Sequence, residues 1–525
     1  MMRTFPRARW AALASILILT FLSGGWLLRP RPAAEGGVYE QARLFEGVVG
    51  AINRHYIDSL GEGDLYHRAA NALVGSLHDP YAELLIKDAY REYQRQMAGT
   101  EVDLERGPSE SGWEGGSGGN VIAPGDEVLS INGQNTRGWS PERLDEALRR
   151  TSGPTVTMVV KPRGAPDPVV RRFTRTEIHV PAASRGVMLA DGVGYIVVRR
   201  MSQGAAEELR AAIDTMVGQG MTSLVLDLRS NPGGLIREGV SVAGLFLDAG
   251  DTIATSIGRS SKRPRSYLAE APSDWGDLRL AVLVNRGTAS SAELVAGALQ
   301  DHDRAVVVGT ATYGKGVLQT TYPIGQDVAI KLTTARWFTP SGRTVQRPRA
   351  DTAGAIGNRI PATRPRVFYS SRGRVVPDAS GILPDLLVRA MPRSEGERLL
   401  AARLGSDMSR FRDVLAGYAA ELRAGQDIQV DSAPMTPERR DTLFARMSEA
   451  GVRLDRGTYD LAGGFVEEQL ENELARAFFG SDSLLRRKAR NDRQLQAALA
   501  VIRRAPTQDD ALTAAMRMQL SGRIR

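Results

Sequence analysis

The chain has 525 residues, of which 42% are hydrophobic and 24% charged, a balance typical of about three or four domains of roughly 100–200 residues with ordinary cores. It contains no cysteine, which excludes disulfides, thiolate metal sites and cysteine nucleophiles, and its five histidines do not stand at metal-ligand spacing, so we expect no metal and no other cofactor. The formal net charge of +8 is spread along the chain rather than gathered in one block, which argues against a nucleic-acid partner.

The N-terminus has the pattern of an export signal. Arg3, Arg7 and Arg9 precede an apolar run over residues 10–28, followed by Arg29. A run of this length just spans a bilayer, and it also fits the apolar region of a secretory signal peptide. No small-x-small cleavage site follows, which favours an uncleaved signal anchor over a cleaved signal peptide. We therefore expect a protein of the cell inner membrane that faces the periplasm, or a periplasmic or secreted protein if residues 1–37 are removed.

Residues 38–104 are predicted to form an N-terminal helical segment. Apolar residues recur at helical spacing from Val38 to about Gly99. The second helix is expected to run to Leu77 and stop at His78-Asp79-Pro80, and a third to cover residues 82–97. These helices would serve as packing or lid elements.

A PDZ-like segment is predicted over residues 105–164. A Gly/Ser-rich loop at 106–120 precedes a strand that ends in an Asn132-Gly133 turn, a helix and a second strand over 155–161. The Gly-Asp and Ile-Asn-Gly run resembles that of PDZ domains, which bind extended peptides or C-termini by strand addition. The Gly/Ser-rich stretch stands where such a domain has its carboxylate-binding loop, so the domain is expected to be truncated there.

Residues 165–390 alternate between short apolar strands and helices, which predicts α/β architecture around a buried sheet. The expected strands are 195–198, 224–228, 280–284, 305–308 and 328–335, and the expected helices are 205–217, 236–247 and 291–301.

Residues 391–525 are charged and helical in pattern, with little strand character. Apolar positions such as Phe465, Leu470 and Leu474 recur at near-helical spacing. This C-terminal helical region either packs on the core or provides a surface for a homo-oligomer or an adaptor.

Two segments stand out for their chemistry. In the first, small residues surround Ser290 where a buried strand enters a helix. A side chain at such a turn lies over free N–H groups of the helix N-terminus, although a lone serine there is more often a simple N-cap. In the second, Lys315 lies between two glycines in a Gly-x-x-x-x-Gly-Lys run. The next residue is Gly316 rather than the Ser or Thr of a phosphate-binding loop, and a strand follows, so nucleotide binding is not expected.

Together the two segments resemble the C-terminal processing (tail-specific) peptidases, the serine peptidases of family S41. The shared runs are Thr288–Glu293, Ala298–Asp301, Arg304-Ala305, Val308-Gly309 and Gly314–Gln319, with further likeness at 78–81, 227–234, 338–343 and 381–385. The resemblance extends over residues 40–390 and implies a crotonase/ClpP-like peptidase core with a PDZ-like domain inserted after N-terminal helices. The nucleophile in the family lies three residues before the glutamate and twenty-five before the lysine, which selects Ser290; Ser291 remains an alternative because it and Ala292 are swapped against the family pattern.

The resemblance also implies roles for the other site residues. Lys315 would be the general base and Gln319 its neutral hydrogen-bond partner. The run at 227–234 would supply an oxyanion N–H from Gly234, with Gly233 as the fallback, and Ser291 the second one. His302 lies in a polar Asp-His-Asp run, and we interpret it as a solvated helix end rather than a catalytic base.

The chemistry is reasonable without the resemblance. A serine hydroxyl is a weak nucleophile until a base takes its proton, and a lysine becomes a base when burial lowers its pKa. The resemblance implies a serine endopeptidase that cleaves extended or unfolded polypeptides, near their C-termini, and the export signal favours a location in the bacterial envelope. The alternatives are a non-catalytic PDZ-type peptide-binding scaffold and a crotonase-like enzyme of acyl thioesters; the export signal argues against the latter.

Overall fold

The structure is a computed structural model that falls into two units, residues 1–78 and 79–525. It describes residues 38–106, 127–137, 139, 143–144, 147–148, 153–161, 166–259, 263–347, 367–377, 380–424 and 436–522. The predicted membrane segment at 10–28 lies outside the described residues. Among the helices that are described, none is both long enough and apolar enough to cross a bilayer.

The first unit is a pair of helices, α2 (Val38–His55) and α3 (Glu62–Gly75). They contact each other through the rings of Phe45 and Tyr66, whose centroids lie 6.0 Å apart. Both helices agree with the predicted pattern. The third predicted helix, 82–97, is wrong at its start, where Glu83–Ile86 forms strand β1 before helix α4 (Asp88–Ala98). Strand β1 exists because it pairs with a strand some 240 residues later, a partner that local periodicity does not reveal.

An antiparallel sheet of five strands, in the order β2-β6-β5-β3-β4, forms the PDZ-like part. Its strands are β2 (Thr100–Arg106), β3 (Glu127–Ile131), β4 (Gln134–Asn135), β5 (Thr155–Lys161) and β6 (Val169–His179). The predicted turn is confirmed: Asn132 and Gly133 have φ angles of 48° and 81°, as a two-residue hairpin turn requires. Strands β2 and β6 pair along their length and carry the sheet beyond both predicted boundaries, 105 and 164. Except for Arg106, the predicted Gly/Ser-rich loop at 106–120 lies outside the described residues.

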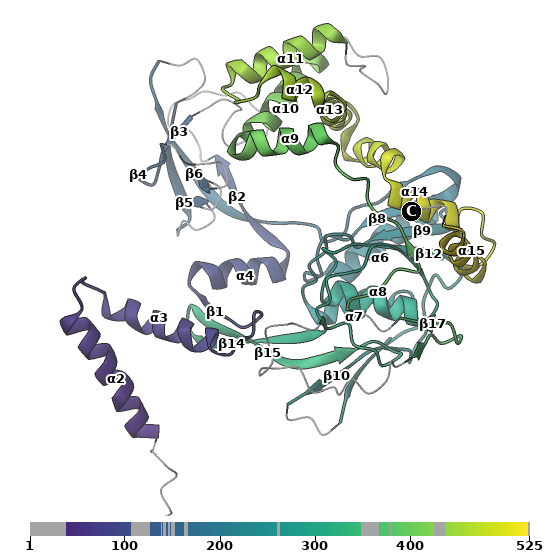
Figure 1. The fold of residues 1–525 in the computed structure, drawn as a ribbon, viewed down its shortest axis with the longest axis horizontal. Coiled ribbons are helices and arrows are strands. Elements are labelled where there is room, and N and C mark those ends of the chain that lie inside the picture. Colours follow the sequence, from purple (N-terminus) through teal and green to yellow (C-terminus); the bar gives the residue numbers. More distant parts are fainter. Residues whose placement is uncertain are drawn as a thin grey trace, which may run out of the picture. The chain divides into compact units, whose positions relative to one another are not determined.

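The predicted α/β architecture is confirmed in a six-stranded sheet with the order β18-β13-β12-β9-β8-β7 (Figure 1). Five strands run parallel and β7 is antiparallel. The bounds are β7 (Val187–Met188), β8 (Val193–Val197), β9 (Ser223–Asp227), β12 (Arg279–Val284), β13 (Val306–Gly309) and β18 (Leu386–Leu387), joined through α6 (Ala205–Gly218), α7 (Ile236–Gly244) and α8 (Ser291–Asp301). Right-handed crossovers between neighbouring parallel strands place these three helices on one face.

Helices from distant parts of the chain cover the two faces of this sheet. Side chains alternate along each strand: Ile196 packs in the core under α6, α7 and α8, whereas Tyr195 packs in the core on the other face. That other face is covered by α14 (Arg493–Ile502) and α15 (Gln508–Ser521). The predicted boundary at 390 is corrected here, because α14 and α15 share an apolar core with the second face of the parallel sheet.

A second, antiparallel sheet has the order β1-β15-β10-β11, with β14 also paired to β15. Its later strands are β10 (Thr252–Gly258), β11 (Arg265–Leu268), β14 (Val317–Gly325) and β15 (Val328–Phe338), and a short hairpin of β16 (Phe368–Tyr369) and β17 (Val375–Val376) follows. Strand β15 carries Lys331 and Trp337 toward the loop before β14, where the candidate site lies.

The helices α9 (Glu395–Leu404), α10 (Met408–Ala424), α11 (Pro437–Glu449), α12 (Arg456–Leu461) and α13 (Gly463–Asn491) share a separate apolar core. Leu470 and Leu474 are buried in it and Phe465 packs against it. These three positions therefore pack within the bundle itself. Assembly through this region stays a prediction.

Candidate active site

The site lies at the carboxyl ends of the parallel strands β9, β12 and β13, the edge at which open α/β sheets bind their ligands. Ser290 occupies the turn between β12 and α8, as predicted, and is 6% exposed. Its backbone angles, φ 55° and ψ −120°, are costly for a residue with a side chain. A strained strand-to-helix turn of this kind holds a nucleophilic hydroxyl out from the backbone.

Hydrogen bonds to the neighbouring loop hold this turn. Thr288 Oγ1 donates to the carbonyl of Leu228 at 2.8 Å, and the backbone N–H of Ala289 donates to the carbonyl of Asn231 at 2.9 Å. Both acceptors follow β9. The nucleophile turn and the loop after β9 are therefore fixed relative to each other.

Lys315 lies in the loop between β13 and β14 and is half-buried. Its Nζ lies 4.8 Å from the centre of the Tyr81 ring, and its carbonyl accepts a hydrogen bond of 3.1 Å from Trp337 Nε1. Burial, and after it the positive charge of Lys331, lowers the pKa of Lys315 to about 8, while Glu293 and Asp79 oppose the shift. A lysine with this pKa is partly neutral near pH 8 and can accept a proton.

A buried carboxylate, Glu293, joins the two predicted catalytic residues. Its Oε2 accepts the backbone N–H of Ser290 at 2.9 Å and that of Lys315 at 2.8 Å. Its Oε1 accepts the N–H of Gly314 at 2.7 Å and the Thr312 hydroxyl at 2.5 Å. Because both nitrogens bond one oxygen atom, the backbones of Ser290 and Lys315 lie within two hydrogen-bond lengths of each other.

In the sequence, Glu293 served only to identify Ser290, which lies three residues before it. The available signal was its position three residues into a helix that begins at a serine, where a glutamate reaches back to the N-cap backbone. Glu293 is fully buried. Burial raises the pKa of its carboxyl, and the four hydrogen bonds that it accepts oppose that shift.

Two predicted contacts are not made in this arrangement. Within the described residues, no hydrogen bond links Ser290 Oγ to Lys315 Nζ, and none links Gln319 to Lys315. Gln319 lies on β14 beside a break in the strand register, and its side-chain amide donates to Thr333 Oγ1 at 3.5 Å. The orienting role of Gln319 stays a prediction.

The two predicted oxyanion donors have free N–H groups. In the described part of the chain, neither Gly234 nor Ser291 donates its backbone N–H to another residue, whereas the N–H of Gly233 donates to Asn231 Oδ1 at 2.9 Å. The fallback donor is therefore already occupied. Gly233 has a φ of 87°, and a Cβ added there would lie 2.9 Å from the Cβ of Ser290, so only glycine allows this loop to approach the nucleophile so closely.

His302 lies at the other end of α8, about 18 Å from Ser290 along the helix at 1.5 Å per residue. Its Nε2 bonds the carbonyl of Thr252 at 2.8 Å and its Nδ1 bonds Ser371 Oγ at 3.1 Å. It is a helix end, as expected, but the expectation of a solvated side chain is wrong, since the side chain is only 15% exposed. It is buried because β10 and the 371 loop pack against this end of the helix.

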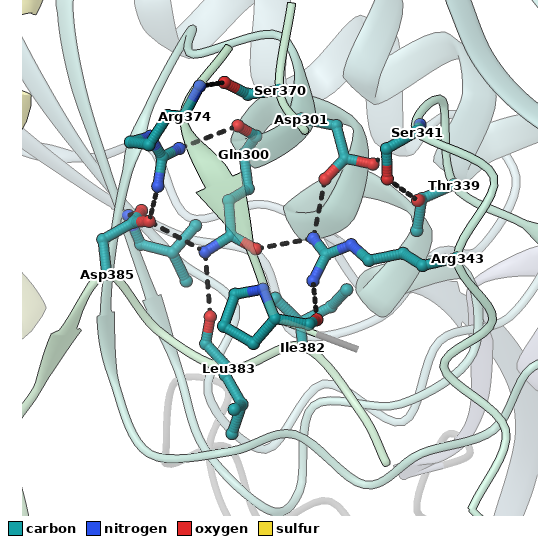
Figure 2. Close-up of polar contacts among 12 residues, drawn as sticks. Gln300, Asp301, Thr339, Ser341, Arg343, Ser370, Arg374, Ile382, Leu383 and Asp385 are labelled. Carbon is teal, nitrogen blue, oxygen red and sulfur yellow. Dashed lines mark hydrogen bonds and ion pairs between the residues drawn. The ribbon is translucent and has the colours of Figure 1, made fainter. Parts of the chain in front are cut away.

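Other motifs behind the family resemblance meet in a buried polar network at this far end of α8 (Figure 2). Arg343 forms an ion pair of 2.7 Å with Asp301, both side chains being 1% exposed, and donates to Gln300 Oε1 at 2.7 Å. Gln300 in turn donates to Asp385 Oδ1 at 3.0 Å, and Asp385 pairs with Arg374. These motif residues hold the helix that presents Ser290 rather than the reacting groups themselves.

Among the residues that the structure describes, no group of three or more His, Asp or Glu side chains is placed to hold a metal ion.

Comparison with known proteins identifies two domains. Residues 192–352 match Peptidase family S41, and residues 114–161 match the PDZ domain. The chain is 28% identical to a probable CtpA-like serine protease of Staphylococcus haemolyticus over 58% of its own length and 63% of the relative's. It is 29% identical to a carboxy-terminal-processing protease of Bartonella bacilliformis, over 59% of its own length and 74% of the relative's.

Among solved structures, the photosystem II D1 C-terminal processing protease is 27% identical over 57% of this chain and 89% of that one, with a TM-score of 0.34. The alignment spans less than two thirds of the length of the staphylococcal relatives. The match to Peptidase family S41 includes strands β8 to β15 and the turn at Ser290, and the match to the PDZ domain includes strands β3 to β5. Residues 192–352 of this chain are therefore similar to peptidase family S41, and residues 114–161 are similar to the PDZ domain.

Proposed function

We propose that this chain is a serine endopeptidase in which Ser290 is the nucleophile and Lys315 the general base. The observation that carries the proposal is the pairing of a strained serine turn with a lysine of lowered pKa, both hydrogen-bonded through their backbones to the same oxygen of Glu293. A lysine with an ordinary pKa would be protonated at neutral pH and unable to activate the serine.

The reaction would proceed by acyl transfer. Neutral Lys315 takes the proton of Ser290 Oγ as this oxygen attacks the scissile carbonyl carbon, and the resulting oxyanion accepts the free N–H groups of Gly234 and Ser291. The charged lysine then gives its proton to the leaving amine. A water molecule, deprotonated by the same lysine, attacks the ester carbonyl, and the lysine returns this proton to Ser290 Oγ as the C–O bond breaks and the carboxyl product leaves. For the first step, Nζ must move from the Tyr81 ring to within hydrogen-bond reach of Ser290 Oγ.

For the substrate, we propose extended or unfolded polypeptide cleaved near its C-terminus. The PDZ domain supports this substrate class, since such domains bind extended peptides by strand addition. The names of the curated relatives, carboxy-terminal-processing and CtpA-like serine proteases, support the position of the cut. We also place the core in the crotonase/ClpP-like class, on the repeated strand–helix units β8–α6, β9–α7 and β12–α8.

We propose an envelope location, with residues 10–28 as the membrane anchor. The support is the order of charge and apolarity in the sequence, three arginines followed by a span-length apolar run. A fusion of alkaline phosphatase after residue 40 is expected to be active in a bacterial host only while residues 10–28 are present. Equal activity without them would contradict the location.

Cleavage of casein by purified protein tests the catalytic proposal. Ser290→Ala and Lys315→Ala should each abolish cleavage while the protein stays folded. Lys315→Arg should abolish it as well, because arginine keeps the charge but does not lose its proton. Ser448→Ala and Lys488→Ala, at exposed positions of α11 and α13, are matched controls that should retain wild-type rates.

Full activity in folded Lys315→Ala would overturn the lysine as base. An inactive wild-type protein whose Ser290 also fails to react with a fluorophosphonate would favour the peptide-binding scaffold instead.

A further inference from the structure

We infer that Glu293 is the positioning residue of this site. Its carboxylate fixes the turn at Ser290 and the loop at Lys315 relative to each other. The inference rests on the proposed function of Ser290 and Lys315. Neither the matched domains nor the relatives' names assign this residue a role. It is a buried ionisable group that the acyl-transfer steps themselves do not use.

The hydrogen bonds show why the residue is a carboxylate. Four donors converge on Glu293: the backbone N–H groups of Ser290, Lys315 and Gly314, and the hydroxyl of Thr312. An ionised carboxylate is an acceptor only, and its two oxygens offer about four lone-pair sites. The four donors therefore fill the carboxylate, two on each oxygen, and no neutral side chain offers four acceptor sites in the same shape.

The hydrogen bond from Ser290 to Glu293 restrains the backbone of the strained turn. The turn at Ser290 has a costly backbone conformation, and such conformations persist only where the surroundings fix them. The bond from its N–H to Oε2 is one such restraint. Since Lys315 bonds the same oxygen, a shift of the first turn of α8 displaces both catalytic backbones together and preserves their separation.

The charge of Glu293 also acts on Lys315 and favours its protonated form. The other charged groups that act on Lys315 are Lys331 on β15, which opposes protonation, and Asp79 before β1, which favours it. Lys331 is itself paired with Glu83 of β1, at 2.6 Å. Replacing the carboxylate by a neutral amide removes an attraction for the proton, so the pKa of Lys315 should fall.

Glu293→Gln separates these effects. The amide has a single oxygen. If this oxygen takes the Oε2 position, it still accepts the backbone N–H groups of Ser290 and Lys315. The NH₂ group then takes the Oε1 position, where it can donate to the Thr312 hydroxyl. It cannot accept the N–H of Gly314, so that hydrogen bond is lost. The relative position of the Ser290 turn and the Lys315 loop is then only partly maintained. We expect kcat to fall by on the order of 10- to 100-fold, as for a small misplacement of reacting groups, with KM little changed and the acid limb of the kcat–pH profile at lower pH.

Asp385→Asn is the matched control. Asp385 is a buried carboxylate whose pKa is raised by burial, and it accepts a backbone N–H, from Val307, and a side-chain amide, from Gln300. It lies at the far end of α8 from Ser290. This variant should lower the melting temperature, yet the folded protein should keep the wild-type kcat and acid limb.

If Glu293→Gln does not fold, Thr312→Val provides the second test. It removes one donor from the carboxylate and should lower kcat by a smaller factor at constant KM. Wild-type kcat and acid limb in folded Glu293→Gln, or wild-type kcat in folded Thr312→Val if the former does not fold, would overturn the positioning role. Failure of the proposed function itself looks different, because the wild-type protein would then not cleave casein at all.

Discussion

At the scale of single residues, the pKa of Lys315 is set by burial and by charges from three separate segments. Burial and Lys331 lower it, whereas Glu293 and Asp79 raise it. The value of about 8 is thus a balance rather than the effect of one neighbour. Each contribution can be changed by a single substitution, and the sign of the change follows from the charge removed.

The wild-type kcat should rise with pH along a limb centred near pH 8, because Lys315 must lose its proton to act as base. Lys331→Met removes a positive charge that disfavours protonated Lys315. The pKa of Lys315 should therefore rise and the limb should move to higher pH, the opposite direction from Glu293→Gln. Casein cleavage at saturating substrate between pH 6 and 10 measures both limbs.

Lys488→Met, at an exposed position of α13, removes the same charge far from Lys315 in sequence and should leave the limb in place. An unmoved limb in Lys331→Met would show that this charge does not act on the base.

The places of Ser290 and Lys315 in the fold were predictable from the sequence because the signals are local. Ser290 and Lys315 follow from motif spacing, and both lie where the chain leaves a parallel strand. The role of Glu293 was not predictable in the same way, since its partners Thr312 and Gly314 belong to another loop. The ring of Tyr81 beneath Lys315 was missed for the same reason: more than 230 residues separate them, and only the fold brings them together.

At the scale of elements, α8 is the element on which the site is built. All eleven of its residues are buried, which is unusual for a helix and means that it cannot shift without disturbing a core. Its first turn carries Ser290 and Glu293, and its last turn carries Gln300 and Asp301. The network of Figure 2 fixes the second end, so the stability of the helix in its core also depends on residues at the end opposite to Ser290.

Arg343→Met tests this dependence. It leaves the Asp301 carboxylate buried without its ion-pair partner, a loss that typically costs about 3–5 kcal/mol of the free energy of unfolding. Arg456→Met is the matched control, since Arg456 forms its ion pairs at the surface with Asp441 and Asp460, where a pair contributes about 0–1 kcal/mol. Urea unfolding of both variants measures the difference. Equal, small losses would show that the buried pair does not fix the helix.

Elements of the parallel sheet were predictable because they are continuous apolar runs bounded by turns. The predicted strands at 195–198 and 280–284 differ from β8 and β12 by at most two residues at either end. Elements that owe their existence to distant pairing were not predictable. Strand β1 was taken for the start of a helix, and β10 was not predicted, because the partner of both is the distant strand β15.

At the scale of the whole molecule, the parallel sheet depends on the end of the chain. All three crossover helices cover one face, so the other face is completed only when α14 and α15 pack on it. An amphipathic helical pattern shows that a helix has a partner but not which one, and the sequence therefore suggested a separate C-terminal region. Arg229, four residues before Gly233, strengthens the link through an ion pair of 2.6 Å with Asp492 at the start of α14.

A charge on the buried face of α14 should therefore unfold or strongly destabilise the peptidase core. Ala498 is completely buried between α14 and the sheet, so Ala498→Asp would place a carboxylate among apolar side chains without a partner, at a cost of at least about 3 kcal/mol. Leu520→Asp is the control, since Leu520 on α15 is 87% exposed. Melting temperature and casein cleavage should both fall in Ala498→Asp and stay unchanged in Leu520→Asp. A wild-type melting temperature in Ala498→Asp would mean that the sheet is stable without its second cover, and that residues 493–522 are an appendage rather than part of the core.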